Sequence, residues 1–110
     1  MSYTGIVKFK DFQGRDIELS ESSWEHIQVA HPEISIKDIE SALTNPSEVV
    51  ECPRQEFVEL YYQVKLHPAG KQRFYVVVVK VLSSGNFIST AMTTSMMKKG
   101  RSLYRKGNTK

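Results

Sequence analysis

The sequence predicts a single α+β domain in which a short N-terminal hairpin and two helices pack on one face of a roughly four-stranded antiparallel sheet. Helical periodicity dominates residues 20–45, and strand-like patterns dominate residues 56–94. The connectors between the strand-like stretches are short, and short connectors join antiparallel strands because parallel strands need a long crossover. At 110 residues, the chain is large enough to bury one core and too small for two.

A predicted hairpin and a first helix open the chain. Residues 3–9 and 17–19 are strand-like and flank the turn FQGRD, which contains a glycine. Ser22 and Glu25 then have the spacing of a capping box, in which side chains satisfy free backbone N–H groups at the start of a helix. This helix should end at or before His31, because the proline that follows disfavours helical backbone at the residue before it.

A second helix and three strands are expected next. The helix should begin at Ser35 and end at Asn45-Pro46, with apolar residues at helical spacing between them. The strands are expected over residues 56–66, 73–82 and 87–94. The middle strand, RFYVVVVKVL, is apolar enough to be central in the sheet.

The last part of the chain is basic. The segment after Ser95, MMKKGRSLYRKGNTK, is expected to begin as a helical turn and to end in disorder. The chain is therefore interpreted as one domain over residues 1–103 followed by a basic C-terminal tail over residues 104–110.

Counting residues across the two tight hairpins predicts which side chains share a face of the sheet. With Leu66 opposite Arg73 and Leu82 opposite Phe87, polar side chains gather on one face. They are Glu59, Tyr61, Gln63, Lys65, Lys80, Ser89 and Thr93. The other face is the expected seat of the helices and carries Val58, Leu60, Tyr62, Val64, Val77, Val79, Val81 and Ile88. A β-bulge would reverse the assignment beyond it.

Charge is divided unevenly along the chain. All 12 acidic residues lie in residues 1–59, together with only five of the 15 Lys and Arg residues. The other ten cations lie in residues 60–110, where there is no acid. Clustered cations release counterions from phosphates and so point to a polyanionic partner. Mutual neutralisation of the two halves across the fold is an equal alternative.

Composition argues against several classes of protein. The longest apolar run is far shorter than the roughly 20 residues that cross a bilayer, and the N-terminus lacks a signal-peptide pattern. We therefore expect a cytoplasmic protein with no membrane partner. The one cysteine, Cys52, excludes an internal disulfide and is a poor start for a zinc site. No metal or other cofactor is expected.

Two histidines of the first helix are candidates for chemistry. His31 shares a helical stripe with Trp24 and Ile27, so it should be partly buried, whereas His26 points away and should be more exposed. Their spacing of five does not match the i, i+4 pair of a helical metal site. If they act in catalysis, His31 suits proton transfer and His26 suits phosphate contact. The structural alternative is that His31 only caps the helix and His26 only faces water.

Lys80 is a third candidate. It lies in VVVVKVL, where its ammonium would be poorly solvated unless a phosphate or a partner meets it. The structural alternative is a lysine near a strand end that reaches water and pairs with Glu59.

Short motifs along the chain resemble one known family. They are Trp24, His26-Ile27, His31-Pro32-Glu33, Leu60-Tyr61-Tyr62, VVVVKVL, Phe87, Thr90-Ala91 and Lys98-Lys99-Gly100. In this order they resemble the phage-associated branch of the barnase–EndoU–colicin–RelE-like nucleases, over roughly residues 17–103.

The resemblance implies a metal-independent endoribonuclease of the toxin or effector type, in which a ribose 2′-hydroxyl attacks the adjacent phosphate. It implies proton transfer by histidine and stabilisation of the developing charge by Lys80. The implied contacts to RNA, with transfer RNA as one candidate, are Tyr61, Thr90, Thr93, Lys98, Lys99 and Arg101. Strand parity instead favours Ser89 and Thr93 over Thr90, so which threonine faces the site stays open at this point.

Two departures from the family pattern keep a second function open. Ala30 stands where members tend to have arginine, and Met92 stands where they tend to have an aromatic residue. The arginine would be a planar phosphate ligand. The alternative is therefore a non-catalytic module that keeps the nuclease-like fold and binds RNA or an acidic protein, such as an immunity protein or antitoxin.

Overall fold

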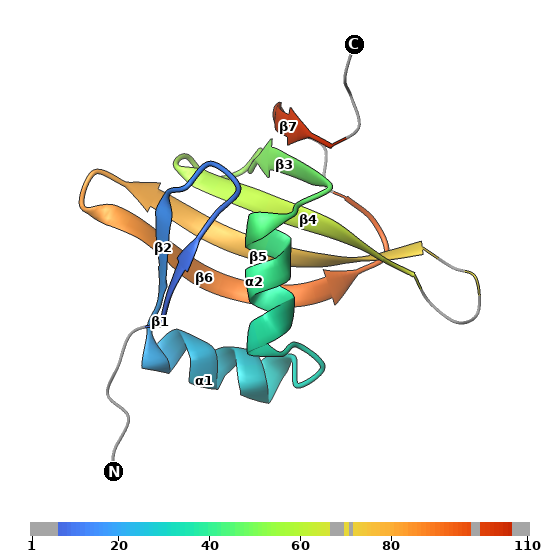
Figure 1. Cartoon of the computed structure of the whole chain (residues 1–110), viewed down its shortest axis with the longest axis horizontal. Helices are drawn as coiled ribbons and strands as arrows, with labels where there is room; N and C mark the ends of the chain where they lie inside the picture. The colour runs from blue at the N-terminus through green and yellow to red at the C-terminus, as the bar shows by residue number, and fades with distance from the viewer. Residues whose placement is uncertain (1–6, 67–69, 71, 98–99, 107–110) are drawn as a thin grey trace.

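The computed structural model describes residues 7–66, 70, 72–97 and 100–106. Within them, the strands are β1 (Val7–Lys10), β2 (Asp16–Leu19), β3 (Glu48–Glu51), β4 (Val58–Leu66), β5 (Gln72–Leu82), β6 (Gly85–Thr94) and β7 (Ser102–Arg105), and the helices are α1 (Glu21–Ala30) and α2 (Ile36–Thr44). All seven strands form one sheet, in the order β1-β2-β6-β5-β4-β3-β7. Both helices lie on the same side of this sheet (Figure 1).

Each helix begins at a serine cap. The Ser20 hydroxyl accepts a hydrogen bond from the Ser23 amide, so α1 begins two residues earlier than the predicted cap at Ser22. Ser35 and Asp38 form a full capping box at the start of α2, and α2 has the predicted bounds. The first helix also ends where the sequence predicts, immediately before His31-Pro32.

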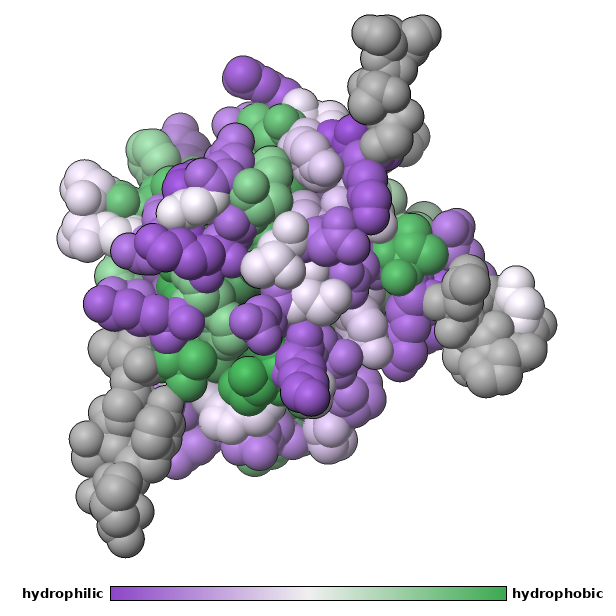
Figure 2. Space-filling model, in the orientation of Figure 1, coloured by the Kyte–Doolittle hydropathy of each residue, from purple (hydrophilic) through white to green (hydrophobic). Residues whose placement is uncertain are grey.

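The main core lies between the helices and the sheet. Helix α1 contributes Ile27, and α2 contributes Ile39, Ala42 and Leu43. These residues pack on buried sheet residues that include Tyr61, Val77, Val79, Ile88 and Ala91. Burial of each large aliphatic side chain stabilises the fold by about 2 kcal/mol. Hydrophilic side chains surround smaller apolar patches on the outer surface of this side (Figure 2).

A second, smaller core lies on the opposite face of the sheet. It is formed by Val50, Val58, Leu60, Tyr62, Phe74 and Val76. The chain runs from β6 past β5, β4 and β3 to reach β7 at the far edge, and Met97 from this connection packs against the second core. A Cβ atom at Gly100 would collide with the backbone oxygen of Glu51, so the connection lies directly against β3. Burial on both faces explains why β5 is almost continuously apolar.

The predicted fold class is wrong in the size and the type of the sheet. The sequence predicts neither β3 nor β7, because strands of four residues are too short to show a clear alternation. The segment expected to start as a helical turn contains β7, so the predicted boundary between residues 103 and 104 falls inside a strand. The sheet is mixed because β2 pairs with β6 in parallel. That pairing joins segments about 70 residues apart, for which the sequence carries no local signal.

The predicted register between β4 and β5 is also wrong, by one residue. Leu66 lies opposite Gln72, not opposite Arg73. Because alternate side chains point to opposite faces, this slip changes which residues of the two strands share a face. Tyr61 therefore faces the helices, and Leu60 lies on the opposite face.

None of the helices in the described residues is long and apolar enough to span a membrane.

Candidate functional site

Two cations lie directly opposite each other near one end of the sheet. Lys65 on β4 is the cross-strand partner of Arg73 on β5, next to the connection between these strands. Both side chains are on the face that carries the helices, since they share parity with Tyr61 and Val77 of the main core. Like charges in directly opposed positions destabilise a sheet.

A chain of polar contacts runs from Arg73 to a histidine. Arg73 Nη2 donates to Thr93 Oγ1 on β6 at 3.4 Å, and Thr93 Oγ1 donates to Glu33 Oε2 at 3.1 Å. The same carboxylate oxygen lies 3.8 Å from His31 Nδ1, within ion-pair range. We call the set of Glu33, His31, Lys65, Arg73, Tyr75 and Thr93 the polar cluster.

Local structure places His31 and Glu33 above the sheet. They lie in the short connection between α1 and α2, near the bottom of Figure 1 and just to the right of α1. Ile34 follows them and is buried in the main core, so the connection is anchored against the sheet. The Ile34 amide also donates to the His31 carbonyl oxygen at 3.1 Å, which turns the chain back toward α2. The two polar side chains are therefore held beside the core but partly open to water.

The carboxylate of Glu33 stays charged in this setting. Its pKa is lowered from the ordinary 4.5, chiefly by its own backbone N–H, with further contributions from the Thr93 hydroxyl and from His31 and Lys65. Partial burial opposes this shift. The polar cluster therefore combines one carboxylate with a lysine, an arginine and an imidazole.

An aromatic ring lies next to the two cations. The Lys65 ammonium lies 4.9 Å from the centre of the Tyr75 ring, a cation–π distance. Tyr75 is half-buried and lies opposite Thr93 on the neighbouring strand. On the other side, Gln63 donates hydrogen bonds to the Ser41 carbonyl and hydroxyl oxygens. Helix α2 is thereby attached to β4 beside Lys65.

The structure brings two of the predicted site residues together and separates the others from them. His31 and Thr93 belong to the polar cluster. His26 is exposed on α1, where Ile27 rather than His26 faces the sheet. Lys80 is exposed on the opposite face of β5, about 16 Å along the strand from Tyr75 at roughly 3.3 Å per residue. Lys80 also pairs with Val58, not with Glu59.

A bulge in β6 decides between the candidate threonines. Val78 lies opposite Thr90, whereas Val79 lies opposite Ile88, so Ser89 is the extra residue. Beyond the bulge, Thr93 is on the face of the helices and Thr90 is on the opposite face. The parity argument places Thr93 on the face away from the helices and Thr90 on the face that they cover, so it is wrong for both residues. Thr93 nevertheless belongs to the polar cluster, because the cluster lies on the face of the helices.

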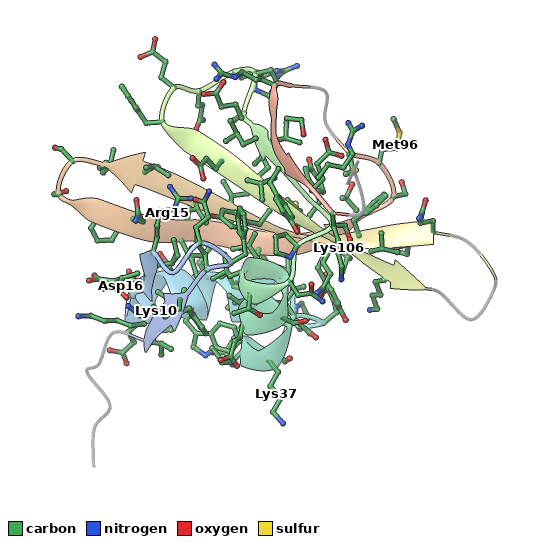
Figure 3. All side chains as sticks on the ribbon, turned by 45° about the horizontal axis from the view of Figure 1, so that its top comes forward. Lys10, Arg15, Asp16, Lys37, Met96 and Lys106 are labelled. Carbon is green, nitrogen blue, oxygen red and sulfur yellow. The ribbon has the colours of Figure 1, made fainter. Side chains whose placement is uncertain are left out.

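Tyr61 is fully buried and is a structural residue. Its hydroxyl donates to Asp11 Oδ2 at 2.7 Å and accepts from Arg15 Nη2 at 2.6 Å. Arg15 also bonds Glu59 Oε1 at 2.8 Å. Arg15 lies in the β1–β2 turn near the exposed ion pair of Lys10 and Asp16 (Figure 3). This network joins the turn to β4, so the Tyr61 ring is not available to a nucleobase.

The basic residues of the C-terminal segment lie elsewhere. Arg101 is exposed, and its carbonyl oxygen accepts from the Glu51 amide on β3, away from the polar cluster. The predicted contacts Lys98 and Lys99 lie outside the described residues.

Sequence reasoning misses four members of the polar cluster: Glu33, Lys65, Arg73 and Tyr75. One available signal is the placement of Lys65 and Arg73, each close to the same hairpin in strands that are otherwise largely apolar. Only the observed register makes them direct neighbours.

The polar cluster is partly exposed: the Glu33 side chain is exposed, and the other five members are half-buried. A depression of about 530 Å³ lies elsewhere, between residues 51–59 and Val81, and includes no member of the cluster. Among the described residues, no group of three or more His, Cys, Asp or Glu side chains could hold a metal ion.

Comparisons with protein families, with curated proteins and with solved structures find no match to this chain.

Proposed function

We propose that this protein is an endoribonuclease that cleaves RNA without a metal ion, and that the polar cluster is its active site. The cross-strand pair of Lys65 and Arg73, with His31 in the same contact network, is the observation that carries the proposal. A phosphate that lies between the two cations would relieve their repulsion. His31 is the group in the cluster best suited to move a proton near neutral pH.

The partial exposure of the cluster, at one end of the sheet, supports a polymeric substrate. A chain of single-stranded RNA can lie across the partly exposed end of β4, β5 and β6, with its phosphates on the cations and its bases near Tyr75. The excess of cations after residue 60 adds sequence-independent attraction for phosphates. RNA also supplies the 2′-hydroxyl that makes cleavage possible without an external nucleophile. The cytoplasm, with its abundant transfer RNA, is the proposed place of action.

The proposed reaction is an internal transesterification. His31 accepts the proton of the ribose 2′-hydroxyl, whose oxygen forms a bond to the adjacent phosphorus. The bond between phosphorus and the 5′-oxygen breaks, and that oxygen takes a proton from Lys65 or Tyr75. Arg73 and Lys65 stabilise the additional negative charge on the phosphoryl oxygens in the transition state. The products carry a 2′,3′-cyclic phosphate and a 5′-hydroxyl.

The experiment compares variants of the two histidines. The protein is incubated with transfer RNA and with bulk RNA in excess chelator, and the ends of the fragments are identified. His31→Ala should lower the cleavage rate by about 100-fold or more, because it removes the proton acceptor. His26→Ala is the matched control, since it changes the same side chain on the exposed side of α1, and should leave the rate unchanged. Intact RNA at high protein concentration would exclude the proposed activity.

A second candidate function is RNA binding without cleavage. Ala30 is exposed at the end of α1, directly before His31, so this position offers no side chain that can contact a phosphate. A binding module should show salt-sensitive association with RNA that weakens in Arg73→Gln, with no fragments at any pH. An acidic antitoxin or immunity protein would compete for the same cations, and it should remain bound after nuclease treatment of a lysate.

A further inference from the structure

We propose that Glu33 and Thr93 are positioning residues that hold His31 with Nδ1 toward the protein and Nε2 toward the substrate. The role in catalysis rests on the function proposed above, but the orientation of the imidazole does not. The proposal concerns how the site is organised and identifies two residues that act through His31 rather than on RNA.

The geometry carries this inference. Glu33 Oε2 accepts from Thr93 Oγ1 at 3.1 Å, so its position is set by a strand of the sheet and not only by the connection between the helices. The same oxygen lies 3.8 Å from His31 Nδ1. The carboxylate thus lies on one side of the imidazole, between the ring and β6. The other ring nitrogen, Nε2, is the one left for a substrate.

A neutral imidazole carries its proton on either Nδ1 or Nε2, and its neighbours decide which. A carboxylate 3.8 Å from Nδ1 favours the form with the proton on Nδ1, because the positive end of that N–H then lies near a negative charge. The lone pair then lies on Nε2, where a general base needs it. The same carboxylate stabilises the imidazolium that forms when Nε2 accepts the proton of the 2′-hydroxyl.

The Thr93 hydroxyl connects this arrangement to the phosphate site. It has one proton, which it donates to Glu33, and so its lone pairs are free to accept from Arg73. One side chain therefore contacts both the guanidinium that would bind a phosphate and the carboxylate that orients the base. Through this link, Thr93 holds the Arg73 guanidinium and the His31 imidazole in fixed positions relative to each other.

The orientation is tested by nuclear magnetic resonance on the full-length protein, without RNA. The ¹⁵N shifts of the His31 ring at about pH 8.5, where free imidazole is neutral, report which nitrogen carries the proton. The form protonated on Nδ1 should dominate in the unmodified protein, and its ratio to the other form should fall by about fivefold in Glu33→Gln. In Thr93→Val, the ratio of the two imidazole forms should fall by less than in Glu33→Gln. In Thr93→Ser, which keeps the hydroxyl, the ratio should equal that of the unmodified protein. Glu25→Gln is the matched control on the exposed side of α1.

Kinetics then separates positioning from direct contact. In Glu33→Gln, kcat should fall by about tenfold or more with KM nearly unchanged. An unchanged tautomer ratio in Glu33→Gln would overturn the positioning role, even if cleavage were lost, because Glu33 would then act on the RNA directly. A changed ratio in a protein that cuts no RNA would support the positioning role and reject the nuclease function.

Discussion

Lys65 and Arg73 face each other across β4 and β5, and Glu33 is the carboxylate whose contact network reaches them. Two cations in this position lower the stability of the sheet, while a cluster with an excess of positive charge attracts phosphates. If the proposed site binds RNA, this pair loses stability in the free protein and gains affinity for phosphate.

Removal of one cation should separate the effect of the pair on stability from its effect on RNA binding. Arg73→Gln relieves the repulsion from Lys65, so the free energy of unfolding should stay the same or rise by about 0.5 kcal/mol. RNA binding should weaken, and the slope of log K against log salt should fall by about 0.7 for the one lost phosphate contact. Urea unfolding and binding titrations at several salt concentrations measure both. Lys80→Gln, on the opposite face of the same strand, is the control; equal loss of binding in both variants would count against the proposed site.

Asp11 should make the stability of the protein depend on acid. Burial would raise the pKa of Asp11, but hydrogen bonds from Tyr61, Arg15 and Gln13 outweigh it and lower the pKa below the ordinary 3.8. Because the folded-state pKa lies below the unfolded one, the contribution of Asp11 is present at neutral pH. It is lost as the pH falls below about 4 and through the folded-state pKa.

The test of this contribution is a substitution. Asp11→Asn should destabilise the protein by about 3 kcal/mol at neutral pH, since Arg15 loses a buried partner. The difference from the unmodified protein should shrink in acid, as measured by thermal unfolding between about pH 7 and pH 2.5. Asp16→Asn breaks only an exposed ion pair and should have a small effect. A constant difference at all pH values would show that Asp11 contributes through packing alone.

The two tyrosines of neighbouring strands should respond in opposite ways. Tyr61→Phe removes the buried hydroxyl that bonds both Asp11 and Arg15, so it should cost about 1–3 kcal/mol of stability and leave RNA cleavage nearly unchanged. Tyr75→Phe should leave stability nearly unchanged and lower cleavage if the phenol protonates the leaving oxygen. Denaturant unfolding and cleavage assays on both variants decide. Loss of activity in a folded Tyr61→Phe protein would restore Tyr61 as a site residue.

Gly100 should tolerate no side chain. An added Cβ would meet the Glu51 carbonyl oxygen and the Val50 side chain, so Gly100→Ala should destabilise the protein by about 1–3 kcal/mol as the connection moves away from β3. Gly14→Ala provides the comparison: its φ of +86° is strained for alanine, but no atom lies within 4 Å of the added Cβ. Hydrogen exchange should therefore increase at β3 and β7 in Gly100→Ala only. Unchanged exchange there would contradict the close packing of this connection.

The sequence by itself determined the helices, the N-terminal hairpin and the three long strands. Their signals are local: a serine cap and a capping box, a proline after His31, and apolar periodicity over nine residues or more in each long strand. Helical spacing also predicts the different exposure of the two histidines, although His31 is the C-cap of α1 and lies just beyond the helix. His26 is exposed and His31 is partly buried, as predicted.

Only the tertiary structure decided which residues form the candidate site. The meeting of Lys65 with Arg73 depends on a register that differs by one residue from the simplest hairpin, and the placement of Thr93 depends on a bulge. Such details are set by the packing of both faces of the sheet, because a one-residue slip exchanges every buried side chain for an exposed one. The approach of Glu33 to β6 is likewise a contact across 60 residues, made when Ile34 enters the core. Lys80 is conspicuous in the sequence for its apolar neighbours, and it lies on the face away from the helices, as the sequence predicts. Only the fold shows that the polar cluster lies on the other face.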